Sequence, residues 1–199
     1  MPINSSEHVV FFGDSITDCG WDRNAAGSLG DGYVKIIAER MPLVRVTNRG
    51  ISGNRVYDLE ARLDTDVLSL KPDIVSILIG INDTWRTFDT GLASPIPEFQ
   101  ASYRRIIERL LAAKCRVVLL EPFLLPIPGD RRAWRLDVDL RIGAIRELAW
   151  DFHLPYLPLD GTFASAAATT ELAHWLPDGV HPSAAGHELI ATEWIADFA

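Results

Sequence analysis

The chain has 199 residues, of which 48% are hydrophobic and 23% charged, and its formal net charge is −8. This composition is typical of a soluble globular protein and excludes a disordered or fibrous chain. The acidic balance disfavours nucleic acids and anionic membranes, so we expect neither as a partner. Two cysteines, Cys19 and Cys115, are too few for a disulfide framework.

The beginning of the sequence carries no targeting signal that we recognise. No basic segment and no apolar run precede the first strand pattern, which starts at His8. No apolar run approaches the roughly 18 residues that a membrane-spanning helix needs. We therefore expect a cytoplasmic protein.

Apolar runs alternate along the chain with segments of helical periodicity. Buried strands are expected at residues 8–13, 43–48, 73–80 and 115–122, and a short fifth strand within 154–160. Helices are expected at residues 32–42, 56–70, 97–113, 136–153 and 183–198. This alternation predicts a parallel sheet that is covered by helices on both faces, and thus one α/β domain over residues 1–199.

Residue types that suit catalysis follow several of the predicted strands, in "GDSIT", "NRGISGN" and "GIND", and precede the last helix in "DGVHP". The carboxyl ends of parallel strands meet at one edge of a sheet, so these segments should lie together. They suggest nucleophilic acyl transfer, with Ser15 as nucleophile, His181 as base and Asp178 as the carboxylate that orients the imidazole. The backbone N–H groups of Ser15 and Gly53 and the Asn82 amide are candidate donors to an oxyanion.

Each of these residues also has a simpler structural interpretation. Ser15 could cap a helix, and Asn82 could form an Asx-turn. Gly53 could serve only a positive φ, and His181 could be a hydrogen-bonded residue of a turn. The catalytic interpretation is favoured because all of them fall at the same edge of the predicted sheet.

Other catalytic motifs are absent from the sequence. There is no G-x-S-x-G, no P-loop and no G-x-G-x-x-G after the first strand. Asp178, His181 and His187 could in principle bind a metal ion, but no cysteine or further histidine lies nearby in the sequence. We therefore expect neither a metal nor another cofactor.

The four motifs together resemble those of the SGNH (GDSL) hydrolase family, in order and spacing from end to end of the chain. The resemblance implies a three-layer α/β/α fold with a flavodoxin-like, five-stranded parallel sheet, and ester hydrolysis without a cofactor. It also implies that Ser15, Asp178 and His181 are catalytic and that Ser15, Gly53 and Asn82 form the oxyanion hole.

A narrower similarity is carried by "GDSITDCG", "NRGISGN", "IGINDTWR" and "DGVHPSAAGH". These segments look like those of intracellular acetylxylan esterases of the same family. That similarity implies a small-molecule ester substrate, an acetylated sugar such as an acetylated xylo-oligosaccharide, and a homo-oligomer. Two alternatives stay open: a lipase- or thioesterase-like enzyme for longer acyl chains, and a non-catalytic carbohydrate-binding protein.

Aromatic and basic residues beside these motifs are candidates for substrate binding, namely Trp85, Arg86 and Trp175. Indole faces stack on sugar rings and arginine binds hydroxyl groups, but both tryptophans could equally pack loops against the core. Phe123 or Leu124 could also line the cleft. The Pro-rich segment 122–130 has no assigned substrate, and its apolar side chains could serve oligomer contacts.

Overall fold

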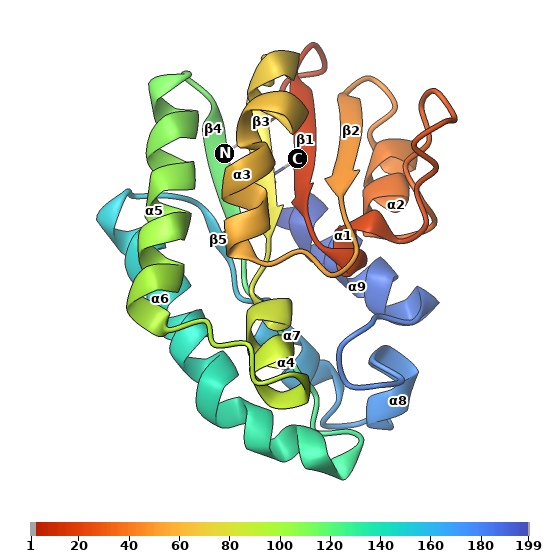
Figure 1. The fold of residues 1–199 in the computed structure, drawn as a ribbon. Helices are drawn as coiled ribbons and strands as arrows, with labels where there is room; N and C mark the ends of the chain where they lie inside the picture. Colours follow the sequence, from red (N-terminus) through yellow and green to blue (C-terminus); the bar gives the residue numbers. More distant parts are fainter. Residues whose placement is uncertain (1–2, 199) are drawn as a thin grey trace.

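The structure, a computed structural model, describes residues 3–198. In this range five parallel strands form a sheet in the order β2-β1-β3-β4-β5 (Figure 1). The strands are β1 (His8–Gly13), β2 (Arg45–Gly50), β3 (Ile74–Leu78), β4 (Arg116–Leu120) and β5 (Tyr156–Leu157). This order is the flavodoxin-like one, and it confirms the predicted α/β fold.

The longer helices cover both faces of the sheet (Figure 1). On one face α2 (Tyr33–Arg40) packs against α9 (Ala184–Phe198), and on the other α3 (Val56–Asp66) packs against α5 (Ile96–Ala112), beside which α6 (Arg135–Asp151) lies. The predicted three layers are therefore present.

The central strand shows why both faces are apolar. Val9 and Phe11 of β1 belong to the core on the α2 and α9 side, whereas Val10 and Phe12 belong to the core on the α3 and α5 side. Successive side chains of a strand point to opposite faces, so a strand that is covered on both sides has no polar position in its middle. All four side chains are completely buried.

Several short helices lie beyond the carboxyl ends of the strands or within connections. They are α1 (Ser15–Asp18), α4 (Ile81–Asp89), α7 (Leu159–Ala166), α8 (Leu172–Trp175), η1 (Leu68–Leu70) and η2 (Gly129–Trp134). Apart from η1, which falls within the helix predicted over residues 56–70, they were not predicted from the sequence. The helix predicted over residues 56–70 ends at Asp66, because Val67 leaves the helical conformation before η1 begins.

Two glycines allow close packing at the carboxyl ends of β1 and β2. A Cβ atom on Gly50 would lie 2.1 Å from the backbone nitrogen of Asp18, and one on Gly13 would lie 2.5 Å from the carbonyl oxygen of Leu78. Only residues without a side chain fit at these positions. As a result α1 packs directly on the end of β2, and the segments that follow β1 and β2 meet.

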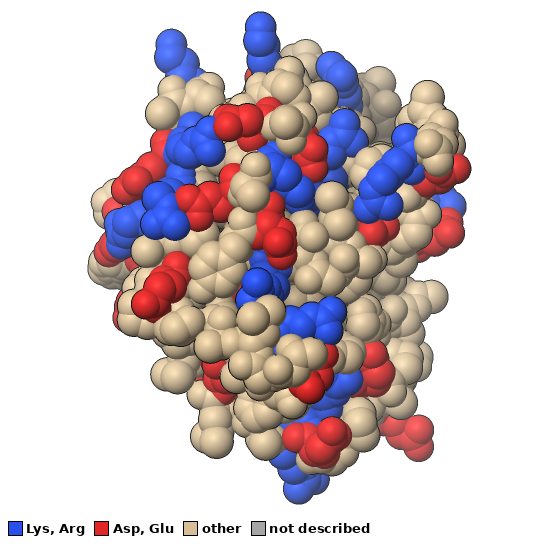
Figure 2. Space-filling model, in the orientation of Figure 1, with Lys and Arg blue, Asp and Glu red and all other residues tan. Residues whose placement is uncertain are grey.

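Basic and acidic side chains are interspersed on the face that carries α3 and α5 (Figure 2). Ion pairs join these two helices, Glu60 to Arg105 and Asp64 to Arg109. Exposed pairs of this kind each contribute at most about 1 kcal/mol. Between residues 3 and 198, no helix combines the length and the apolar character required to cross a membrane.

Candidate active site

Ser15 is the first residue of α1, directly beyond the end of β1. The residue before it, Asp14, caps the helix, because its Oδ1 accepts a hydrogen bond of 3.0 Å from the backbone N–H of Ile16. The capping role that the sequence allowed for Ser15 therefore belongs to Asp14. The backbone N–H of Ser15 stands at the start of a helix, where it has no acceptor within the helix.

A chain of hydrogen bonds joins Ser15, His181 and Asp178. Ser15 Oγ lies 3.1 Å from His181 Nε2, and His181 Nδ1 lies 2.7 Å from Asp178 Oδ2. The other oxygen of Asp178 accepts the backbone N–H groups of Val180, at 2.9 Å, and of His181, at 2.7 Å. A carboxylate only accepts hydrogen bonds, so Nδ1 carries the proton of the neutral imidazole and Nε2 is the acceptor for the Ser15 hydroxyl.

Charges of both signs act on the half-exposed imidazole of His181. The hydrogen bond to Asp178 raises the pKa of His181 above its ordinary value, and the charges of Asp178 and Asp14 add to this effect. Burial and the guanidinium of Arg131 oppose it. Burial also acts to raise the pKa of Asp178, but the hydrogen bonds from His181 and from Val180 hold that pKa well below its usual range. Asp178 is therefore ionised at neutral pH.

Asp14 is a second carboxyl group beside Ser15, and it is completely buried. Its Oδ2 has no hydrogen-bond partner within residues 3–198. Burial raises the pKa of Asp14 to about 7, although the hydrogen bond from Ile16 and the nearby His181 work in the opposite direction. This group is therefore partly protonated at neutral pH, unlike Asp178.

Gly53 and Asn82 come from the segments that follow β2 and β3. Gly53 has a φ of +83°, which favours glycine. Asn82 lies in the first turn of α4, and not in the Asx-turn that was its simpler structural interpretation. Gly80, with a φ of +130°, lets the helix begin immediately beyond β3. The buried Asn82 amide donates one hydrogen bond, of 3.0 Å, to the backbone oxygen of Asn54. Its second N–H remains available to a ligand.

Arg62 on α3 connects these segments, and the sequence analysis did not identify it. Its guanidinium donates to the backbone oxygen of Gly13 at 3.0 Å, to Asn54 Oδ1 at 2.7 Å and to Asp66 Oδ2 at 2.8 Å. It also lies 4.4 Å from the centre of the Phe12 ring. One side chain thus links the end of β1, before Ser15, to the turn that contains Gly53.

Asp18 fixes the same turn from the other side. The backbone N–H and the hydroxyl of Ser52 both donate to Asp18 Oδ2, each at 3.0 Å. Asp18 lies on α1 and Ser52 directly precedes Gly53, so the helix that carries Ser15 is bonded to the Gly53 turn. Asp18 was not predicted from the sequence, although it stands only three positions after Ser15 in "GDSITD".

Of the predicted substrate-binding residues, Trp85 lies nearest the imidazole. Its ring centre is 5.8 Å from that of His181 and 5.2 Å from that of Trp134 in η2. The Arg131 guanidinium lies against both indoles, 4.1 Å from the Trp85 centre and 3.9 Å from the Trp134 centre. We call Trp85, Trp134 and Arg131 the aromatic wall. Trp134 and Arg131 were not predicted from the sequence.

Arg86 and Trp175 are placed differently. Arg86 pairs with Asp89 at 2.7 Å, and its Nη2 would lie 3.8 Å from a Cβ on Gly53, so it flanks the Gly53 turn. Trp175 packs against the core on the α9 side, with its ring edge-to-face against His174. Among residues 3–198, Trp85 makes the ring contact with His181 and Trp175 makes none. The packing interpretation is therefore the better one for Trp175.

The Pro-rich segment lies against the loop that carries Asp178 and His181. The backbone N–H of Leu125 donates to the oxygen of Gly179 at 2.9 Å, and a Cβ on Gly179 would lie 2.1 Å from the oxygen of Ile127. Phe123 and Leu124, either of which could have lined the cleft, are both buried in the core. The apolar side chains of this segment are buried in the core, and its backbone packs against the loop that carries His181.

His187 takes no part in the hydrogen-bonded chain. Its Nδ1 accepts the backbone N–H of Tyr33 at 3.2 Å, and its Nε2 lies 3.3 Å from Cys19 Sγ. Burial lowers the pKa of His187 to about 4, so it is neutral at physiological pH. Within residues 3–198, no three His, Cys, Asp or Glu side chains are grouped as metal ligands would be.

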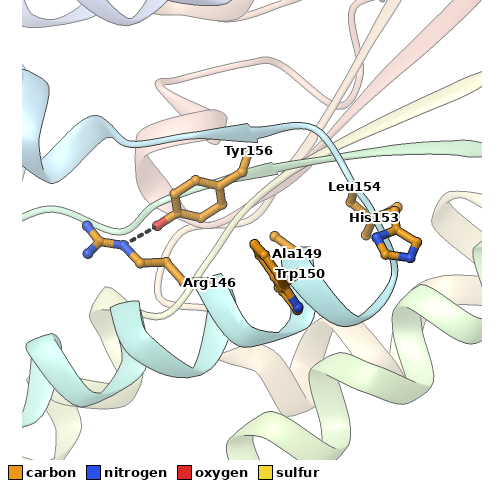
Figure 3. A pocket seen from close by; sticks show the side chains of 6 residues that line it. All are labelled: Arg146, Ala149, Trp150, His153, Leu154 and Tyr156. Carbon is orange, nitrogen blue, oxygen red and sulfur yellow. Dashed lines mark hydrogen bonds between the residues drawn. The ribbon is translucent and has the colours of Figure 1, made fainter.

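A separate cavity lies at the carboxyl-terminal end of α6 (Figure 3). It is lined by Arg146, Ala149, Trp150, His153, Leu154 and Tyr156. The Tyr156 hydroxyl accepts a hydrogen bond of 3.3 Å from Arg146 Nε. These residues belong to the last turns of α6, the connection that follows it and the beginning of β5, at the amino-terminal edge of the sheet, so the cavity is not part of the Ser15 site.

Comparisons with known proteins agree with this geometry. Residues 11–189 match the GDSL-like lipase/acylhydrolase family. An acetylxylan esterase from Geobacillus stearothermophilus is 34% identical over 99% of this chain and 96% of its own length. A crystal structure of an acetylxylan esterase from that organism superposes with a TM-score of 0.88 at 33% identity, covering 99% of this chain and 96% of that one. A GDSL-like lipase structure from Parabacteroides merdae gives a TM-score of 0.93 at 33% identity, covering 99% and 98%.

Proposed function

Because the chain belongs to the GDSL-like lipase/acylhydrolase family and is a carboxylic ester hydrolase, we propose that Ser15, His181 and Asp178 are its catalytic residues. The observation that carries this proposal is the hydrogen-bonded chain from Ser15 Oγ through His181 to Asp178. Its two bonds have the direction that a serine nucleophile needs, since Nε2 is free to take the hydroxyl proton.

In the proposed mechanism Ser15 Oγ attacks the acyl carbonyl carbon while His181 Nε2 accepts the hydroxyl proton. The carbonyl oxygen becomes an oxyanion, which the backbone N–H groups of Ser15 and Gly53 and the free N–H of Asn82 stabilise. The imidazolium, stabilised by Asp178, then protonates the leaving alcohol, and an acyl-enzyme remains. Water, deprotonated by His181, releases the acid and restores Ser15.

We further propose that the acyl group is acetyl and that the alcohol is a carbohydrate, such as a xylo-oligosaccharide. The acetylxylan esterase relative supports this substrate, as do the indole rings beside His181. A series of aryl esters of increasing acyl length tests the acyl part. A preference for octanoate over acetate would overturn the acetyl proposal and favour the lipase- or thioesterase-like alternative.

Replacement of the nucleophile tests the central proposal. Ser15→Ala removes only the hydroxyl oxygen of a partly buried side chain, so we expect the variant to fold. Its kcat for 4-nitrophenyl acetate should fall by at least about 10³-fold. Circular dichroism and thermal unfolding of the variant provide the control for folding. A folded Ser15→Ala protein with wild-type esterase activity would contradict the assignment, because the nucleophile would then have to be another residue.

We also propose that the chain forms a homo-oligomer. The apolar side chains of the Pro-rich segment, which the sequence analysis considered for this role, are largely buried. Instead α6 exposes Leu136, Leu140 and Trp150, which are 80%, 58% and 82% accessible, on one side of the helix. Light scattering of the purified protein measures the oligomeric state, and replacement of Trp150 by Glu should lower it.

A further inference from the structure

A cavity of about 400 Å³ lies beside β2, the strand at one edge of the sheet. The loop between α1 and α2 contributes Trp21, Arg23 and residues 25–29 to its lining. The strand contributes residues 45–49, and Leu70 completes the lining. None of the proposed catalytic residues lines this cavity, so it is separate from the candidate active site.

Arginines give this cavity its charge. Arg23, Arg45 and Arg49 line it, and no acidic residue of the described range does. Within residues 3–198, Arg45 and Arg49 form no ion pair, and the Arg49 guanidinium donates only to the backbone oxygens of Asn48 and Asp66, each at 3.2 Å. Figure 2 shows basic side chains along β2, at the upper right of the view. The cavity is therefore a positively charged site on a protein of net charge −8.

Trp21 brings two of these cations to the same place. Its indole N–H donates to the backbone oxygen of Gly50 at 2.7 Å, which holds the ring against the end of β2. The guanidinium carbons of Arg23 and Arg49 lie 4.8 Å and 5.5 Å from the ring centre, and each cation is attracted to the ring. Arg23 reaches a single acid, Asp18, at 3.3 Å. Two guanidinium groups thus border one indole, and one carboxylate accompanies them.

These arginines are accessible and retain free donors. The Arg23 side chain is 49% exposed, Arg45 is exposed and Arg49 is partly buried. Within residues 3–198, no hydrogen bond uses the Arg45 guanidinium, and both bonds from the Arg23 guanidinium come from its Nη2. A ligand that enters from solvent therefore meets N–H groups that have no acceptor in the protein.

A neighbouring histidine responds to the same charges. His8 Nε2 lies 2.8 Å from the hydroxyl of Thr47, which lines the cavity. Burial lowers the pKa of His8, and the charges of Arg45 and Arg49 lower it further, although Asp73 acts in the opposite direction. The electrostatic potential along this part of β2 is therefore positive.

Protection of the sheet edge explains only part of this arrangement. Charged side chains on an edge strand hinder pairing with another sheet, which accounts for Arg45 and Arg49. It does not account for Arg23, which lies on the loop and adds a third cation to the same cavity although like charges repel. A bound anion would stabilise all three.

We propose that this cavity binds the phosphate group of a small phosphorylated molecule. A phosphate carries close to two negative charges at neutral pH and three acceptor oxygens, so more than one guanidinium can bond to it. Arginine also presents two parallel N–H groups that match two phosphate oxygens. A carboxylate offers less charge and fewer acceptors, and a neutral sugar would leave every cation unpaired. The test distinguishes inorganic phosphate, a sugar phosphate and a nucleotide as sources of the phosphate.

Isothermal titration calorimetry of the full chain with sodium phosphate, glucose 6-phosphate and ATP tests the proposal. At low ionic strength we expect saturable binding of at least one of them at a single site, and added salt should weaken it. Glucose and adenosine should not bind. Arg45→Met should lower the affinity by at least about tenfold, the range of a lost charge-assisted hydrogen bond. The matched control, Arg132→Met, removes an exposed charge from η2 and should keep the affinity.

Lack of saturable binding by all three phosphate compounds would overturn the proposal. An affinity that is unchanged in Arg45→Met, or lowered equally in Arg132→Met, would also overturn it, because the attraction would then belong to the surface as a whole. If Arg45→Met does not fold, Arg23→Met takes its place with the same expected loss. Ser15→Ala should bind the phosphate compound as the wild type does, and a loss of binding there would place the anion in the catalytic site and contradict the inference.

Discussion

The two sides of the candidate site are held together by different forces. On the side of Gly53 and Asn82, polar bonds dominate: Arg62 and Asp18 connect the ends of two strands and a helix through several short hydrogen bonds. The aromatic wall on the other side is held by ring contacts, and it retains enclosed donors without acceptors. Hydrogen bonds fix direction, which an oxyanion requires, whereas flat rings accept alcohols of different shapes.

Loss of the Asp178 carboxylate, which orients the imidazole between the two sides, should have the largest effect on catalysis. In Asp178→Asn the new amide can donate to His181 Nδ1, which forces the proton onto Nε2, so the imidazole can no longer accept the Ser15 proton. We expect kcat for 4-nitrophenyl acetate to fall by about 10⁴-fold. A change of less than about tenfold would contradict the assigned tautomer.

The same variant should change the pH dependence. His181 acts as a base only when it is neutral, so activity rises with pH through its pKa, which Asp178 raises. Without the carboxylate that pKa is lower, and the acidic limb of the kcat/KM profile should move to lower pH. An unmoved acidic limb would show that another group controls it.

Removal of the Asn82 amide should have the next largest effect. Asn82→Ala deletes one proposed oxyanion donor, which typically lowers kcat by about 10²–10³-fold. KM should change much less, because the bond is made mainly in the transition state. Asn4→Ala, an exposed substitution at the opposite end of β1, is the control. A near wild-type kcat for Asn82→Ala would exclude the amide from the mechanism.

Asp14, the buried carboxyl group beside Ser15, should affect stability more than the chemical step. Burial raises the pKa of Asp14 to about 7 from an unfolded value near 4, so the folded state binds a proton that the unfolded state has lost. This group therefore subtracts stability as the pH rises between these two values. Asp14→Asn keeps the capping oxygen and removes the titration.

Urea unfolding at about pH 5 and pH 8 measures the difference between wild type and Asp14→Asn. The stability of the variant relative to wild type should increase with pH. Parallel pH dependences of the two proteins would show that Asp14 does not titrate in this range.

Substitution in the aromatic wall should have the smallest effect on the chemical step. Trp134→Phe keeps a ring against Arg131 but leaves space in a buried site, so the free energy of unfolding should fall by about 1–2 kcal/mol. The kcat for aryl acetate should fall far less than it does in Asn82→Ala. A loss as large as that of Asn82→Ala would mean that the wall also positions the reacting groups.

The fold could be predicted where the spacing of apolar residues in the sequence follows their burial in the structure. The apolar run of β1 and the stripe of α3 indicated their elements, because covered strands and packed helices must be apolar at fixed spacing. The helix α4 was missed, since Gly80 lets it start without the loop that usually separates strand from helix. The break at Val67 was missed because the apolar spacing continues through it.

The candidate site was predictable where motifs lie in the loops at one edge of the sheet. Ser15, Gly53 and Asn82 follow strands, Asp178 and His181 lie in the loop before the last helix, and the predicted topology brought these segments together. Arg131 gave no such signal. Its contacts join η2 to α4. No pattern in the sequence around Arg131 predicts a contact with Trp85, which is distant along the chain.

The position of Ser15 and His181 along the chain has a consequence for synthesis. The two residues are 166 positions apart. At about 5–20 residues per second, a ribosome needs roughly 10–30 s to pass from one to the other. On the proposed roles, the growing chain holds its nucleophile and oxyanion donors through that interval but has no base. Hydrolysis can begin only once the loop before α9 has been made, so a chain that is released early is inert toward esters.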